Sequence, residues 1–287
     1  MNIFPDIRGP IASATNDLVD FLVVDYGDAF EAFSNVLLQG LLFIERGLRA
    51  VPPWAMILII AAVALAASRK PLMAVGAAAG LWFIGALGMW DQAMQTLAII
   101  LVSVCFCILV GLPLGVLAAS SRMFRRGLIP VLDLMQTIPS FVYLIPAAML
   151  FGLGKVPAIL ATVIYALPPL IRLTDLGIRE VDGEVVEASR AFGATRAQIL
   201  TGVQIPLSMP TIMQGINQTT MLALSMVVIA SMIGARGVGE TVLLGLQRND
   251  SGTGLVGGIT IVILAVVIDR ITQAYGRRLQ RHRSAEA

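Results

Sequence analysis

Long apolar stretches recur along this chain of 287 residues, and they restrict its fold more than any other feature. A helix needs about 20 mostly apolar residues to cross a bilayer. Seven stretches approach this length, at residues 54–68, 72–89, 94–119, 129–151, 156–171, 205–233 and 255–268. Only 13% of all residues are charged, whereas soluble domains carry about 25%. The sequence therefore predicts an all-α integral membrane protein with about seven transmembrane helices.

Basic clusters between the apolar stretches predict the orientation of the chain, because such clusters concentrate in short cytoplasmic loops. If the loop at residues 172–204 is cytoplasmic, alternation of seven spans places three more clusters on that side. These are Arg69 with Lys70, the group from Arg122 to Arg126, and the basic tail at residues 277–287. We therefore expect the N-terminus outside the membrane and the C-terminus in the cytoplasm.

The N-terminal part, residues 1–53, is predicted to be an extracytoplasmic segment that precedes the transmembrane domain at residues 54–276. Between residues 29 and 50 its apolar residues recur at helical spacing, which predicts an amphipathic helix. The residues that set this spacing are Phe30, Phe33, Leu37, Leu41 and Ile44. Such a helix can lie flat on the outer membrane surface or pack against the spans, and the sequence favours neither.

Prolines fall inside or at the edges of several spans, at positions 113, 139, 146, 157, 168 and 169. A helix broken by proline leaves backbone groups that neighbouring helices or a water-lined cavity must satisfy. Broken helices often line the pathway of a transporter. Ordinary kinks are the alternative, since proline is commoner in membrane helices than in soluble ones.

Several kinds of chemistry are absent from the sequence. The chain has one histidine, His282, so it cannot build a His-based triad or a metal site of the HExxH type. The segment GLGKV at residues 152–156 lacks both the leading glycine and the Ser or Thr of a phosphate-binding loop. We predict no catalytic residue, no metal site and no bound cofactor. Cys105 and Cys107 are interpreted as packing residues, and a net charge of +2 gives no indication of nucleic-acid binding.

The loop between the fifth and sixth stretches is much longer than the others and is predicted to be helical in two pieces that break at Gly193. Glu187, Ala188, Ala191 and Phe192 place small residues and one aromatic on adjacent turns. A short helix of this kind can sit closely in a cleft of a partner, and glycine lets the chain turn sharply after it. A surface loop without a partner remains the alternative on this pattern alone.

Residues 187–206 resemble the EAA motif of ABC importer permeases, which reads EAA, three residues, Gly, nine residues, then I-x-L-P. Here Glu187, Ala188 and Ser189 are followed by Gly193 and then by VQIP at residues 203–206. The departures are mild, with Ser for Ala, Val for Ile and Ile for Leu. In that family the loop forms the coupling helix that docks on a separate ATPase subunit. The resemblance implies that the docking element is made of Glu187, Ala188, Ser189, Arg190, Ala191, Phe192 and Gly193.

A narrower resemblance covers about residues 94–276. LDLMQTIPSFVYLIP (132–146), ALPPLIRLTDLGI (166–178), VQIPLSMPTIMQGINQTTMLALSMVVIASMIG (203–234) and VGGITIVILAVVIDRITQA (256–274) are similar to permeases of glycine betaine, proline betaine and choline importers. The resemblance implies a type I ABC importer permease core in a bacterial inner membrane. It also implies a second permease copy, expected as a homodimer, two ATPase subunits that bind ATP and Mg, and an extracytoplasmic substrate-binding protein.

Such an importer would move a quaternary ammonium compound from the binding protein to the cytoplasm. The residues proposed to line its pathway are Thr137, Pro139, Ser140, Asn217, Met221, Ser225 and Met226. Each of these also fits simple helix packing. An uncoupled channel and an ion-coupled carrier are the rival functions. The docking motif argues against a channel, and the lack of acidic residues near the middle of any span argues against a carrier.

Overall fold

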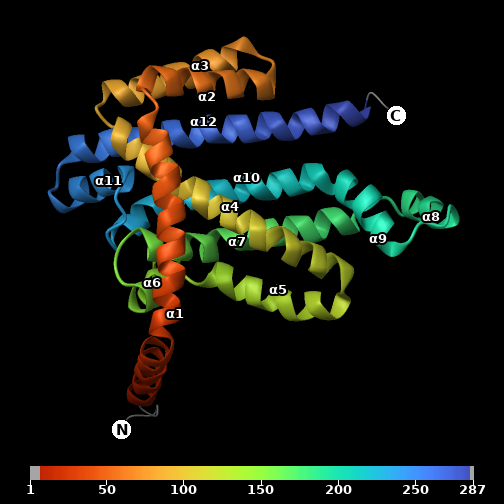
Figure 1. The fold of residues 1–287 in the computed structure, drawn as a ribbon, viewed down its shortest axis with the longest axis horizontal. Coiled ribbons are helices and arrows are strands. Elements are labelled where there is room, and N and C mark those ends of the chain that lie inside the picture. The colour runs from red at the N-terminus through yellow and green to blue at the C-terminus, as the bar shows by residue number, and fades with distance from the viewer. Residues whose placement is uncertain (1–6, 285–287) are drawn as a thin grey trace, which may run out of the picture.

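The computed structural model describes the backbone of residues 7–284 and the side chains of residues 7–277, and this part of the chain is helical without any strand. Figure 1 shows the helices α4, α7, α10 and α12 lying alongside one another as a bundle. The α-helices are α1 (Arg8–Ala50), α2 (Pro53–Ser68), α3 (Pro71–Ala86), α4 (Trp90–Ser120), α5 (Arg122–Thr137), α6 (Leu144–Phe151), α7 (Lys155–Arg179), α8 (Gly183–Ala191), α9 (Arg196–Ile199), α10 (Ile205–Ser231), α11 (Val238–Gln247) and α12 (Ser251–Ser284). The predicted all-α class is confirmed.

The apolar helices coincide with the seven predicted stretches, but fewer than seven of them qualify as spans. Four helical stretches of the described chain are long and apolar enough to cross a membrane, and there are up to six if each bent pair is counted as one span. The four are α4, α7, the stretch Arg196–Ser231 that includes α10, and α12. The bent pairs are α1 with α2 and α5 with α6, and α3 is a shorter apolar helix. Each of the seven predicted stretches therefore falls on a helix or on the bent pair α5–α6.

The break between α5 and α6 lies at one of the predicted prolines. The residue before Pro139, Ile138, is extended, as expected because proline disfavours a helical residue ahead of it. A 3₁₀ turn, η1 (Ser140–Tyr143), then leads into α6, and the two helices meet at 106°. Pro113, Pro168 and Pro169 instead lie inside continuous helices.

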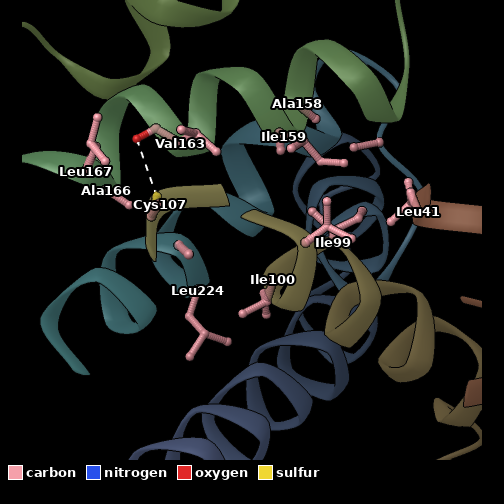
Figure 2. Close-up of a cluster of buried hydrophobic side chains, with 14 of the residues drawn as sticks. Leu41, Ile99, Ile100, Cys107, Ala158, Ile159, Val163, Ala166, Leu167 and Leu224 are labelled. Carbon is pink, nitrogen blue, oxygen red and sulfur yellow. Dashed lines mark hydrogen bonds between the residues drawn. The ribbon is translucent and has the colours of Figure 1, made fainter. Parts of the chain in front are cut away.

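Helix α7 is the centre of the bundle, and α4 and α10 pack along it more extensively than any other pair of elements packs. In the most apolar 18-residue stretch of α7, 67% is buried inside the protein, whereas only 22% of the corresponding stretch of α12 is buried. Figure 2 shows part of this core, where Ile159, Val163 and Leu167 of α7 lie near Ile99 and Cys107 of α4. The Cys107 thiol points at the Val163 carbonyl, 3.8 Å away, which agrees with a packing role.

Two glycines one turn apart bring α4 directly onto α7. A Cβ added to Gly115 would lie 2.5 Å from Cβ of Thr174, and one added to Gly111 would lie 3.0 Å from a methyl of Leu170. Glycines four residues apart give membrane helices a smooth face that lets two backbones approach closely. From the other side, a Cβ on Gly215 of α10 would lie 3.3 Å from Cα of Leu170. The bundle core is thus held by backbone proximity as well as by apolar side chains.

Helix α1 crosses the bundle at the end opposite α8 (Figure 1). Leu41 is fully buried in the main core cluster, and the rings of Phe30 and Phe151 of α6 meet edge to face at 5.3 Å. The predicted packing against the spans is therefore present, and the helix begins at Arg8, well before the predicted residue 29. Whether its outer part lies on a membrane surface stays a prediction.

The close contact at Gly115 leads to a stability prediction. Gly115→Ala should lower the unfolding midpoint, because the new methyl group forces α4 from α7, and overpacking of this kind costs about 1–3 kcal/mol. The measurement is thermal unfolding of the purified chain in detergent, followed by intrinsic fluorescence.

Gly258→Ala on α12 is the matched control, since a Cβ there meets no atom within 4 Å. The higher helix propensity of alanine should leave this control unchanged or raise its midpoint. Equal midpoints for the two variants would contradict the close-approach interpretation.

Candidate functional site

The segment with the docking motif projects from the bundle on the extended ends of α7 and α10. Figure 1 shows α8 and α9 at the far end of the molecule, away from α1 and α11. The Asp182 carboxylate caps α8 by accepting a hydrogen bond from the Glu184 amide at 2.9 Å. None of the residues of α8 is buried. A capped helix whose side chains are exposed or half-buried is suited to docking.

The predicted docking residues lie together on α8 and on the turn that ends it. Glu187, Ala188, Arg190 and Ala191 are exposed, and Phe192 is 93% exposed. Ser189, the departure from the motif, donates its hydroxyl to the Val185 carbonyl one turn back at 2.8 Å. The hydroxyl is thereby satisfied within the helix, so serine can stand where the motif has alanine. A nearly bare aromatic ring beside small residues is typical of a contact that a partner buries.

Gly193 ends the helix for a backbone reason. Its φ is +81°, in the left-handed region that side chains with a Cβ rarely adopt. Its N–H donates to the Arg190 carbonyl, and the next amide, of Ala194, donates to the Ser189 carbonyl. A Cβ at this position would meet open space, so glycine is required by the turn and not by a neighbour. The predicted break of the loop at Gly193 is present.

A new helix starts directly after this turn. Thr195 and Gln198 form a reciprocal capping box at the start of α9, and a π turn, η2 (Leu200–Gln204), then leads into α10. At the other end of the predicted loop 172–204, residues up to Arg179 continue α7. The projecting part is therefore shorter than the predicted loop and is carried by two long helices.

Ion pairs join α5 to α7 near the base of the projecting segment. The buried Asp175 carboxylate accepts from Arg125 of α5 at 2.9 Å and from Arg179 at 2.8 Å. Nearby, Arg172 of α7 pairs with the more exposed Asp133 of α5. A carboxylate held by two guanidinium groups is a charge-assisted contact of fixed geometry. Helix α5 is thus tied to the part of α7 that carries α8.

The residues proposed for the pathway fall into two groups near the α5–α6 break. Thr137 and Pro139 are exposed and Ser140 is half-buried at the break itself. Ser225 of α10 is exposed and donates its hydroxyl to the carbonyl of the half-buried Met221. The turn η1 contacts α10, so the break and this part of α10 are neighbours.

Two of the pathway residues have other contacts in this conformation. Met226 is fully buried in a cluster with Tyr143, Leu144 and Ala161, and it reaches no surface. Asn217 donates its amide to Asp269 of α12 at 3.0 Å. The Asn217 carbonyl oxygen is buried without a hydrogen-bond partner among the described residues. A role for either residue in the pathway stays a prediction.

An ion pair that the sequence did not predict lies at the end of the bundle that α1 crosses. The buried Glu45 of α1 accepts from Lys155 at the start of α7 at 2.5 Å, and Arg49 joins it to Asp91 of α4. A signal was available, because Glu45 is four residues from Leu41 and so shares the apolar face of α1. In the described part of the chain, no group of three His, Cys, Asp or Glu residues could hold a metal ion.

Comparisons with known proteins agree with this arrangement. The family model of binding-protein-dependent transport system inner membrane components matches residues 111–281. The glycine betaine/proline betaine transport system permease protein ProW of Escherichia coli is 48% identical over 93% of this chain and 75% of that protein. The glycine betaine transport system permease protein OpuAB of Bacillus subtilis is 45% identical over 93% of this chain and 94% of that protein. A solved structure of the MetNI methionine ABC transporter in inward facing conformations aligns with a TM-score of 0.58 at 25% identity, covering 68% of this chain and 95% of that chain.

The two ion pairs between α5 and α7 should differ in their contribution to stability. Asp175→Asn leaves two arginines without their buried partner, and we expect a loss of about 1–3 kcal/mol, as for hydrogen bonds to charged groups. Asp133→Asn removes the exposed pair between the same helices, which should cost at most about 1 kcal/mol.

Thermal unfolding of both variants in detergent measures the difference directly. Equal midpoints would show that burial of Asp175 does not strengthen its contacts.

Proposed function

The chain belongs to the family of binding-protein-dependent transport system inner membrane components, and we propose that it is the permease subunit of an ATP-driven importer for quaternary ammonium compounds. Glycine betaine, proline betaine and choline are the substrates we expect. The observation that carries this proposal is the exposed helix α8 with its Gly193 turn, in a chain 48% identical to a glycine betaine/proline betaine permease. Members of this family are inner membrane components of transport systems that depend on a binding protein.

We infer that α8 and its turn dock on a separate ATPase subunit. Phe192, being 93% exposed, is the side chain best placed to enter a cleft of that partner. ATP and Mg would be bound and ATP hydrolysed there, while this chain contributes the docking helix and the pathway. The proposed assembly contains two copies of this permease, two ATPase subunits and one extracytoplasmic binding protein.

The coupling mechanism that we propose follows from the helices that carry α8. Closure of the ATPase dimer moves α8, and α7 and α10 transmit the motion because both continue from this segment into the bundle core. Because Asp175 of α7 pairs with Arg125 of α5, α5 would move together with α7. The break at Pro139 then moves with α5, which would change access to the pathway between inward-facing and outward-facing states.

The proposed substrates are compact methylated cations, which interact with aromatic faces and polarizable thioethers without needing a full negative charge. Met221 lies at the partly buried face of α10 near the break, where such a cation could pass. Met226, now buried beside Tyr143, would contact the substrate only after α6 and α10 separate. Affinity would come mainly from the binding protein, with the permease providing weak contacts along the way.

The orientation that we propose places α8 in the cytoplasm and α1 and α11 outside. It is supported by the basic clusters Arg69–Lys70 and Arg122–Arg126, which are separated from the acidic start of α1 by the apolar helices. The C-terminal tail then lies in the cytoplasm. Its arginines at 278, 281 and 283 lie outside the residues whose side chains are described.

The proposal predicts ATP-dependent uptake. Proteoliposomes that hold this chain and its candidate ATPase should accumulate labelled glycine betaine, choline or both only when internal ATP and the binding protein are present. Flux without ATP would contradict the importer and indicate a channel or an ion-coupled carrier.

Variants at Gly193 test the docking element within the same assay. Gly193→Val should abolish most uptake, because a β-branched residue is strained at φ +81° and the turn after α8 is lost. Gly193→Asn should retain more activity, since asparagine tolerates this backbone region. Gly40→Val on α1, outside the docking element, adds the same bulk where no atom lies within 4 Å and φ is ordinary, and it should transport normally. Normal uptake by Gly193→Val would refute the docking assignment.

A further inference from the structure

A cleft of about 400 Å³ opens on the side of the bundle, between the beginning of α3 and the C-terminal part of α12. Its floor and walls are apolar and include Leu72 and Val266, while Lys70, Arg270 and Arg277 line it with positive charge. None of the residues that line the cleft belongs to α5, α6, α8 or α10, so neither the docking element nor the proposed pathway includes it.

The cations of this cleft have no acidic partner in the described part of the chain. No ion pair there involves Lys70, Arg270 or Arg277, and all three residues are exposed. The backbone of Lys70 is nonetheless fixed, because its N–H donates to the Ser68 hydroxyl at 3.1 Å. Three positive charges are therefore brought to one cleft without an acidic partner among the residues that the structure describes.

The carboxylate next to them in the sequence faces another helix. Asp269 accepts from Asn217 of α10 at 3.0 Å and from Gln273 at 2.7 Å. It is also absent from the lining of the cleft, which contains no acidic residue. A ligand that neutralises Lys70 and Arg270 must therefore bring its own negative charge.

The length of the α2–α3 hairpin places this charge near the membrane surface. Each of the two helices has 16 residues and is about 24 Å long, whereas the hydrocarbon core of a bilayer is about 30 Å thick. The turn with Lys70 therefore cannot extend far into water. Leu72 is 83% exposed and Val266 is 51% exposed, which suits side chains that contact lipid tails.

We propose that this cleft binds an anionic phospholipid of the cytoplasmic leaflet. Lys70, Arg270 and Arg277 hold the phosphate of the headgroup, and one acyl chain lies along Leu72 and Val266. Basic pockets between membrane helices on the cytoplasmic side recognise anionic headgroups in this way. The assignment of leaflet rests on the orientation in the proposed function. The site itself rests on the cleft and its uncompensated charge.

A lipid fits this cleft better than a second copy of the chain. Another protein surface would have to supply acidic residues at the same membrane depth, and the acidic run of this chain, from Asp17 to Glu31, lies on α1 across the opposite end of the bundle. A lipid supplies a phosphate and an apolar tail in the relative positions that the cleft provides. Free phosphate would leave the apolar walls uncovered.

The test is lipid binding by the full chain in neutral detergent, measured by native mass spectrometry during titration with phosphatidylglycerol or phosphatidylcholine. Wild type should prefer phosphatidylglycerol. The double variant Lys70→Gln, Arg270→Gln should bind it about 25-fold more weakly, from about fivefold for each cation removed near the membrane surface. Arg270→Lys keeps the charge, so this single variant should bind phosphatidylglycerol with most of the wild-type affinity, unlike the single variant Arg270→Gln.

The matched control removes two cations from the same end of the bundle, outside the cleft. Arg122→Gln with Arg126→Gln on α5 should bind phosphatidylglycerol as wild type does. Equal loss in both double variants would show a diffuse charge effect and overturn the site. So would full competition by inorganic phosphate, or a change of oligomeric state without a change of lipid affinity. The lipid-binding test uses no ATP, substrate or partner subunit. A negative result would therefore overturn the lipid site without affecting the proposed importer function, which the uptake assay tests.

Discussion

The contact on which the rest of the structure depends is the direct approach of α4 and α10 to α7. Gly115 leaves no room for a Cβ against α7, and Gly111 and Gly215 leave only a tight fit, so α4 and α10 both approach α7 closely. In a bilayer the hydrophobic effect does not drive helices together, because lipid is as apolar as leucine. Close packing must supply the attraction instead. Apolar side chains such as Ile159 then fill the space around the crossings.

This rigid centre explains how a helix with no buried residue can have a defined position. Helix α8 has no buried residue of its own and is placed by α7 and α10. Residues 180–182 join it to α7, and the Gly193 turn, α9 and η2 join it to α10. The pair of Asp175 with Arg125 extends the same rigid unit to α5. In the proposed mechanism, a movement of α8 would therefore reach the α5–α6 break through α7 and α5.

The sequence predicted the fold where a local pattern decides the outcome. The length of the apolar stretches predicted the helices, and the spacing around Gly193 predicted the turn after α8. Six prolines were candidates for a break or a kink, and the sequence did not show that the chain breaks at Pro139 and continues through Pro113, Pro168 and Pro169. It did not predict which charges pair. Glu45 and Lys155 are 110 residues apart, and Asp175 and Arg125 are 50 apart, so only the tertiary arrangement brings them together. The same holds for Met226, whose burial depends on how α6 lies against α10.

The basic residues near the predicted cytoplasmic ends of the helices differ in the partners that the tertiary structure gives them. Arg125 of α5 pairs with a carboxylate of α7, and Arg172 of α7 pairs with a carboxylate of α5. Both arginines therefore stabilise the packing of these two helices. Lys70 and Arg270 face outward over an apolar cleft and meet no carboxylate within the described residues. In the proposed orientation, cations over this apolar cleft would lie close to the negatively charged cytoplasmic leaflet. The difference in pairing therefore separates arginines that hold helices together from those that face the membrane.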